Sequence, residues 1–128
     1  MKMEVGLIGG SIALNANKSI QMLKQGFESS CGLTPEFAQF FNTFKKEFSQ
    51  ELKSVGATDI KFSRGHFDIT GFCTINGQVW YFSLGDVRGS EYQIPNLMYR
   101  TAKDYKDYRG GSNQWVKIES GMASRMFR

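Results

Sequence analysis

The segment that decides the fold is residues 66–84, HFDITGFCTINGQVWYFSL. Two runs rich in aromatic and β-branched residues flank Asn76 and Gly77. Both central positions of a tight type I′ turn need positive φ, and asparagine followed by glycine meets that need. The segment therefore predicts an antiparallel hairpin with a two-residue loop, and so short a loop sets which residues oppose each other.

The predicted register sorts the hairpin side chains onto two faces. The more apolar face pairs Ile75 with Gln78, Cys73 with Trp80, Gly71 with Phe82 and Ile69 with Leu84. We assign this face to the core, and the missing side chain at Gly71 leaves room there for the Phe82 ring. The second face is only partly polar, and its pairs are Thr74 with Val79, Phe72 with Tyr81 and Thr70 with Ser83.

Two amphipathic helices are predicted before the hairpin. The clearer one begins with a capping hydroxyl at Thr34, a proline at position 35 and a carboxylate at Glu36. Its apolar stripe runs for about five turns at helical spacing and comprises Phe37, Phe40, Phe41, Phe44, Phe48, Leu52 and Val55. Its water-facing side is predicted to carry Gln39, Lys45, Lys46, Glu47 and Lys53, and Gly56 marks the stop. An earlier stripe, through Ile12, Ala16, Ile20, Leu23 and Phe27, predicts a helix after a candidate cap at Ser11.

The predicted fold class is α+β, with two N-terminal helices packed on one face of a roughly four-stranded antiparallel sheet. Residues 59–63 and 97–102 favour strands on either side of the hairpin, and residues 115–118 are a further candidate. Residues 103–113, polar and containing two adjacent glycines, predict a loop or a short helical turn. A chain of 128 residues fits one domain, which we predict to span residues 1–128.

Composition bounds the class of protein. The chain is 41% hydrophobic and 22% charged, which is typical of a globular domain. Cys31 and Cys73 are too few for a disulfide framework and match no zinc or redox spacing, which favours a reducing compartment. No stretch approaches the roughly 18 apolar residues of a membrane span, and residues 1–14 lack a signal-peptide pattern. We expect a cytoplasmic protein with no membrane partner and no cofactor.

The excess of positive charge lies at one end of the chain. Residues 1–98 carry nine Lys or Arg against nine Asp or Glu, whereas residues 99–128 carry seven against three. Within that end, residues 99–113, YRTAKDYKDYRGGSN, interleave cations with tyrosines, and we call them the Tyr-rich segment. Its candidate binding residues are Tyr99, Arg100, Lys103, Tyr105, Lys106, Tyr108 and Arg109, with Lys117, Arg125 and Arg128 extending the patch.

This segment predicts a non-catalytic binding module that engages a macromolecule. Lys and Arg can neutralise phosphates while tyrosine rings stack on unpaired bases, but tyrosine and arginine are equally common in protein interfaces. Asp104 and Asp107 lower the local charge, so protein and nucleic acid both stay open, as does a loop without a partner. A homodimer through the second sheet face is another prediction, because it would cover Phe72 and Tyr81.

The Tyr-rich segment, together with residues 69–88, resembles segments of small proteins from phages and other mobile elements. The resemblance is to a type of protein and not to a defined family. It implies an accessory or inhibitory binding protein, and it assigns no role to any single residue.

The alternative is a small hydrolase or nuclease that uses His66 with Asp68 and Asp86. His66 is the only histidine, and Asp68, two residues on, would share its strand face, as a general base and its orienting carboxylate do. Cys73 projects from the opposite face, which leaves no nucleophile beside His66. Asp68, Asp86 and Glu91 all lie near the base of the hairpin. No metal site is predicted there, because the register places Asp68 and Asp86 on opposite faces of the sheet.

A glycine-containing run precedes the first predicted helix. Residues 5–14, VGLIGGSIAL, resemble the glycine turn of nicotinamide dehydrogenases such as prephenate dehydrogenase, which implies a dinucleotide site. Aligning Gly6 and Gly9 with the last two glycines of that motif places Glu4 at the first. The predicted order of helix, helix and hairpin also lacks repeated βα units. The run therefore favours a loop that caps a helix, with phosphate binding at Gly6 to Ser11 as the variant.

Overall fold

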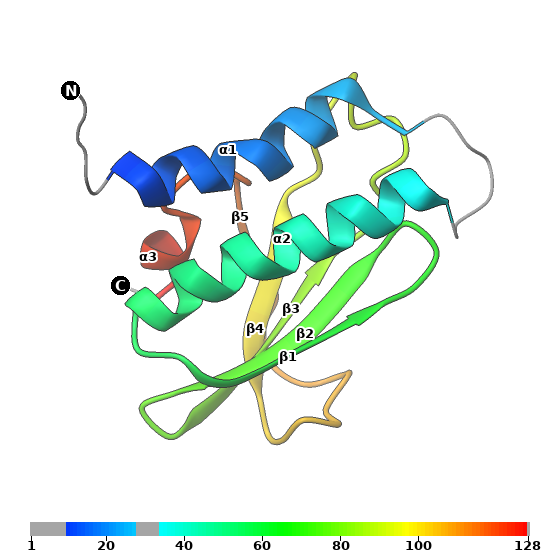
Figure 1. Cartoon of the computed structure of the whole chain (residues 1–128). Helices are drawn as coiled ribbons and strands as arrows, with labels where there is room; N and C mark the ends of the chain where they lie inside the picture. The colour runs from blue at the N-terminus through cyan, green and yellow to red at the C-terminus, as the bar shows by residue number, and fades with distance from the viewer. Residues whose placement is uncertain (1–9, 28–33, 128) are drawn as a thin grey trace.

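The structure is a computed structural model and describes residues 10–27 and 34–127 (Figure 1). Helices α1 (Gly10–Gln25) and α2 (Pro35–Ser54) lie on one side of a five-stranded antiparallel sheet. Because the strands follow one another in chain order across the sheet, every neighbouring pair is joined by a local connection. The predicted α+β class is confirmed, with five strands where the sequence predicts roughly four.

The remaining elements are five strands, whose bounds agree closely with the predictions, and a short C-terminal helix that was not predicted. They are β1 (Thr58–Arg64), β2 (Ile69–Ile75), β3 (Gln78–Leu84), β4 (Leu97–Ala102), β5 (Gln114–Val116) and α3 (Met122–Met126). The fifth strand is the further candidate, which begins one residue earlier than predicted and ends two earlier. None of the helices in the described ranges has the length and apolarity that crossing a lipid bilayer requires.

The hairpin has the predicted turn and register. Asn76 and Gly77 both take positive φ, at 50° and 79°. All seven predicted pairs between β2 and β3 are present, from Ile69 with Leu84 to Ile75 with Gln78. A Cβ atom added at Gly71 would lie 2.4 Å from the Phe82 ring and 2.3 Å from the Lys61 carbonyl oxygen. Glycine is therefore required there for the ring to enter the core, as predicted.

Helix α2 begins and ends as predicted, and its phenylalanine stripe forms the core. The Thr34 hydroxyl accepts a hydrogen bond from the Phe37 amide at 3.1 Å, and Gly56 follows the helix with φ of 92°. Five side chains of the stripe are at most 2% exposed, namely Phe37, Phe40, Phe44, Phe48 and Leu52. Each contributes about 2 kcal/mol by burial. Phe48 packs edge-on against Phe82 of β3, with ring centroids 5.1 Å apart.

Helix α2 also differs from prediction at Glu47, which is buried and not water-facing. Its Oε1 accepts hydrogen bonds from the Ser19 amide and hydroxyl of α1. One turn on, the buried Glu51 accepts from the Gly121 and Ala123 amides, at 3.0 and 3.1 Å, where α3 begins. The two carboxylates thus fasten α1 and α3 to α2, because a buried carboxylate requires donors.

The predictions for the N-terminus can be compared with the structure only from residue 10 onward. Helix α1 begins at Gly10, so Ser11 lies inside its first turn and not before it. The glycine run up to residue 9 lies outside the described residues, and so do Cys31 and Arg128. Cys73 is a free, buried cysteine, and burial raises the pKa of its thiol to about 12.

Candidate binding surface

The loop of residues 103–113 lies against the sheet face opposite α1 and α2, which we call the outer face (Figure 1). Tyr105 stacks on Phe72 with ring centroids 5.3 Å apart and planes at 28°. Tyr108 meets Phe72 and Tyr81 edge-on at 5.4 and 5.8 Å. The chain's own loop therefore covers the two aromatic residues that a homodimer was predicted to cover. Homodimerisation stays a prediction, but the need to cover Phe72 and Tyr81 no longer supports it.

Tyr105 also joins the loop to two strands through its hydroxyl. The hydroxyl donates to the Asp59 carbonyl oxygen at 2.7 Å, and the Thr74 hydroxyl lies 2.7 Å from it on β2. Burial raises the pKa of Tyr105, so the phenol stays protonated and can donate. Tyr105 thus anchors the loop, and its side chain is only partly exposed.

Arg100 of β4 is buried beneath the loop, with 2% of its surface exposed. Its guanidinium lies 4.5 Å from the centre of the Tyr81 ring. It donates to the carbonyl oxygens of Thr101 at 3.2 Å and Asp107 at 2.9 Å. Since these contacts occupy the guanidinium, Arg100 holds the loop and is not placed to meet a phosphate from solvent.

The two aspartates of the loop organise its backbone. The Asp107 carboxylate accepts from the amides of Lys103, Arg109 and Gly110 at 2.9, 3.1 and 2.8 Å. These hydrogen bonds lower the pKa of Asp107. Asp104 accepts from the Lys106 amide at 2.8 Å. From the sequence, both residues were predicted only to lower the local charge, although aspartate at the start of a turn is a recognisable signal for such hydrogen bonds.

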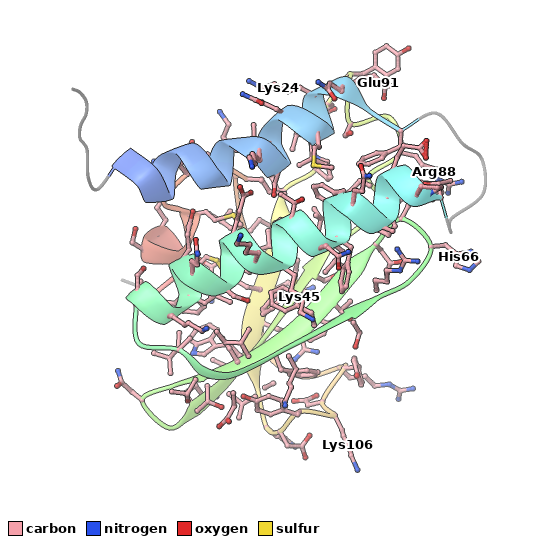
Figure 2. All side chains as sticks on the ribbon, viewed as in Figure 1. Lys24, Lys45, His66, Arg88, Glu91 and Lys106 are labelled. Atoms are coloured by element: carbon pink, nitrogen blue, oxygen red, sulfur yellow. The ribbon has the colours of Figure 1, made fainter. Side chains whose placement is uncertain are left out.

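The structure thus divides the seven candidate binding residues into three groups. Lys103, Lys106, Tyr108 and Arg109 are exposed, and Figure 2 shows Lys106 projecting from the loop into solvent. Arg100 and Tyr105 serve the loop internally. Tyr99 lies on the inner face, 7% exposed, against Trp80 and Phe127. Cations and tyrosines that alternate along the chain therefore do not form one continuous surface in the structure.

Beside the loop, a row of outer-face side chains crosses all five strands. In register order it comprises Ser63, Thr70, Ser83, Met98 and Trp115, which we call the outer row. None of these side chains is fully buried, and Trp115 is 62% exposed. From the sequence, Trp115 was predicted only as part of a strand. Its exposure was recoverable from strand alternation, because its neighbour Val116 faces the core.

The residues of the enzyme alternative do not form a cluster with shared hydrogen bonds. Strand β2 begins at Ile69, so His66 and Asp68 lie in the preceding turn, where Phe67 has φ of 64° and the Gly65 amide donates to the Asp68 carbonyl oxygen. His66 points into solvent (Figure 2). Asp86 is hydrogen-bonded to the Arg88 guanidinium, which lowers the pKa of Asp86.

Metal and thiol chemistry also find no support near this turn. Across residues 10–27 and 34–127, no three His, Cys, Asp or Glu side chains are grouped so that they could hold a metal ion. The buried Cys73 thiol is protonated at neutral pH and is a poor nucleophile. The hydrolase or nuclease reading stays a hypothesis, and the geometry of the outer face supports a binding reading better.

No family model, no curated protein and no solved structure matches this chain.

Proposed function

We propose that the protein is a non-catalytic binding module that holds single-stranded nucleic acid across its outer face. The observation that carries this proposal is that Tyr108 and Trp115, 60% and 62% exposed, lie on the same sheet face as the exposed cations of the loop. Exposed aromatic rings and cations on one sheet face suit unpaired bases and their phosphates.

The cations are presented by a loop that its own hydrogen bonds already order. Lys103, Lys106 and Arg109 project from it, and Lys61, opposite Phe72 on β1, adds a fourth exposed cation at its border. The loop aspartates accept hydrogen bonds from backbone amides, so they lie within the loop's own turns. A preordered loop loses little conformational entropy on binding, which favours affinity.

The test is binding of fluorescent single-stranded DNA and RNA, followed by anisotropy over a salt series. We expect association at low salt that weakens steeply as salt rises, because phosphate contacts release counterions. Tyr108→Ala and Trp115→Ala should each weaken binding roughly tenfold by removing a stacking platform. Lys106→Ala with Arg109→Ala should reduce the salt dependence.

The matched control is Lys45→Ala, which removes an exposed cation from α2 on the other side of the sheet (Figure 2). It should leave nucleic-acid binding unchanged. The proposal is overturned by an absence of binding at low salt, or by binding that survives both aromatic substitutions.

The second candidate is a protein partner at the same face, and the pairing of Met98 with Trp115 favours it. Methionine, tryptophan and tyrosine are enriched in protein interfaces. The partner could be a second copy of this chain. If sedimentation velocity finds a dimer that Trp115→Ala dissociates, while nucleic acid does not bind, the protein candidate replaces the first.

We further propose a cytoplasmic location and an accessory or inhibitory role of the kind found in phages and mobile elements. The free thiol of Cys73 supports a reducing compartment. Fractionation of cells that express the tagged chain tests the location, and recovery outside the cytoplasm contradicts it.

A further inference from the structure

A second surface lies on the helix side of the molecule, away from the outer face. A cleft of about 460 Å³ opens between the C-terminal half of α1, the β3–β4 connection and the segment that leads from β5 into α3. Its volume is within the range of about 300–1,000 Å³ typical of ligand sites.

The floor of the cleft is aliphatic and well supported. It is formed by Ile20 of α1, Ile94 of the β3–β4 connection and Ile118, which follows β5. Ile118 is only 5% exposed, and Ile20 and Ile94 are partly buried against the same core. The floor therefore stays in place without a ligand and offers a ligand an apolar surface.

The rim of the cleft is positive. Lys24, Lys117 and Arg125 line it, against a single carboxylate, Glu119, which pairs with Arg125. Within the described ranges, the side chains of Lys24 and Lys117 make no hydrogen bond or ion pair. Lys24 also lies in the last turn of α1, where the helix dipole favours a cation, but no such reason applies to Lys117.

We propose that this cleft binds an acidic peptide segment of a partner protein. An aliphatic side chain of the segment lies on the isoleucine floor, and its carboxylates pair with Lys24 and Lys117. This arrangement satisfies both features of the cleft, because ion pairs at a rim set specificity while the apolar contact adds affinity. A nucleic-acid strand would use the lysines but would leave the isoleucines without an apolar partner.

The test uses the full chain and three labelled peptides, which alternate Glu with Leu, Glu with Ser, and Lys with Leu. We expect the Glu/Leu peptide to bind at least roughly tenfold more tightly than either of the others. Lys24→Glu with Lys117→Glu should weaken its binding roughly tenfold or more. The matched control, Lys46→Glu with Lys53→Glu, makes the same change of charge at exposed positions of α2 and should leave binding unchanged.

Three outcomes would overturn the proposal: no binding of the Glu/Leu peptide, equal binding of the Glu/Ser peptide, or equal weakening by the control pair. Methyl NMR of the unsubstituted protein supplies a readout that does not depend on variant folding. The Glu/Leu peptide should shift the signals of Ile20, Ile94 and Ile118, and shifts confined to other methyl groups contradict the assignment.

A competition experiment tests whether the peptide site is separate from the proposed nucleic-acid site. Excess single-stranded DNA should not displace the Glu/Leu peptide, since the cleft and the outer face lie on different sides of the sheet. Displacement by DNA would overturn the peptide site. Failure of DNA to bind at all would overturn the proposed function alone.

Discussion

Helix α2 covers the inner face of the sheet, whereas a loop of residues 103–113 covers the outer face. A helix satisfies its own backbone hydrogen bonds, so its cover is a stripe of phenylalanines. A loop has unpaired backbone groups and needs polar partners, which Asp107 and Arg100 supply. The loop covers less of its face than the helices cover of theirs, and it leaves Trp115 exposed. The outer face is therefore the face of the sheet on which a partner can bind.

The largest expected effect is on the helix-covered face. Phe48→Ala should cost about 3–5 kcal/mol of unfolding free energy, because the cavity left among packed rings cannot collapse. Phe72→Ala, beneath the loop, should cost less because the loop can move inward. Urea unfolding of both variants measures the difference, and equal losses would show that the two covers pack equally well.

The next effect comes from the buried cation of the outer face. Arg100→Met should cost about 2 kcal/mol, since it leaves the Asp107 and Thr101 carbonyl oxygens without their donor. Hydrogen exchange should then quicken at the Lys103 and Gly110 amides. Unchanged protection there would mean that Arg100 does not hold the loop.

A smaller effect isolates one hydroxyl. Tyr105→Phe keeps the stacking on Phe72 but removes the hydrogen bonds to Asp59 and Thr74, and should cost about 1 kcal/mol. Tyr105→Ala, which also removes the ring, should cost distinctly more. If both variants unfold at the same denaturant concentration, the ring contributes nothing beyond its hydroxyl.

The smallest expected effect on global stability is an acid response of the loop. The pKa of Asp107 is lowered by hydrogen bonds from three amides, so its contribution is present above the unfolded-state value of about 3.9. It is lost as pH falls through the lower folded-state value. The protection factor of the Arg109 amide, which corrects for the intrinsic exchange rate at each pH, should therefore fall under acid, and Asp107→Asn should abolish that pH response. An unaltered response in the variant assigns it to another group.

The parts of this protein that could be predicted are those with a repeating pattern. The stripe of α2 repeats at helical spacing, and the hairpin alternates around Asn76 and Gly77, so their inward faces follow from local geometry. Loops have no period, so nothing local separates Tyr105, which turns inward, from Tyr108, which stays exposed. His66 was misplaced for the same reason, because positive φ at Phe67 ends the strand pattern before β2 begins.

By itself, the sequence determined the start of α2, the tight turn, the register of β2 with β3 and the face that becomes the core, because these depend on residues close together in the chain. Only the tertiary structure decided that Glu47 and Glu51 turn inward to meet α1 and α3, and that Arg100 is covered. A charged side chain takes its place from whichever distant segment brings donors or acceptors to it, and residues far apart in the chain carry no mark of that meeting.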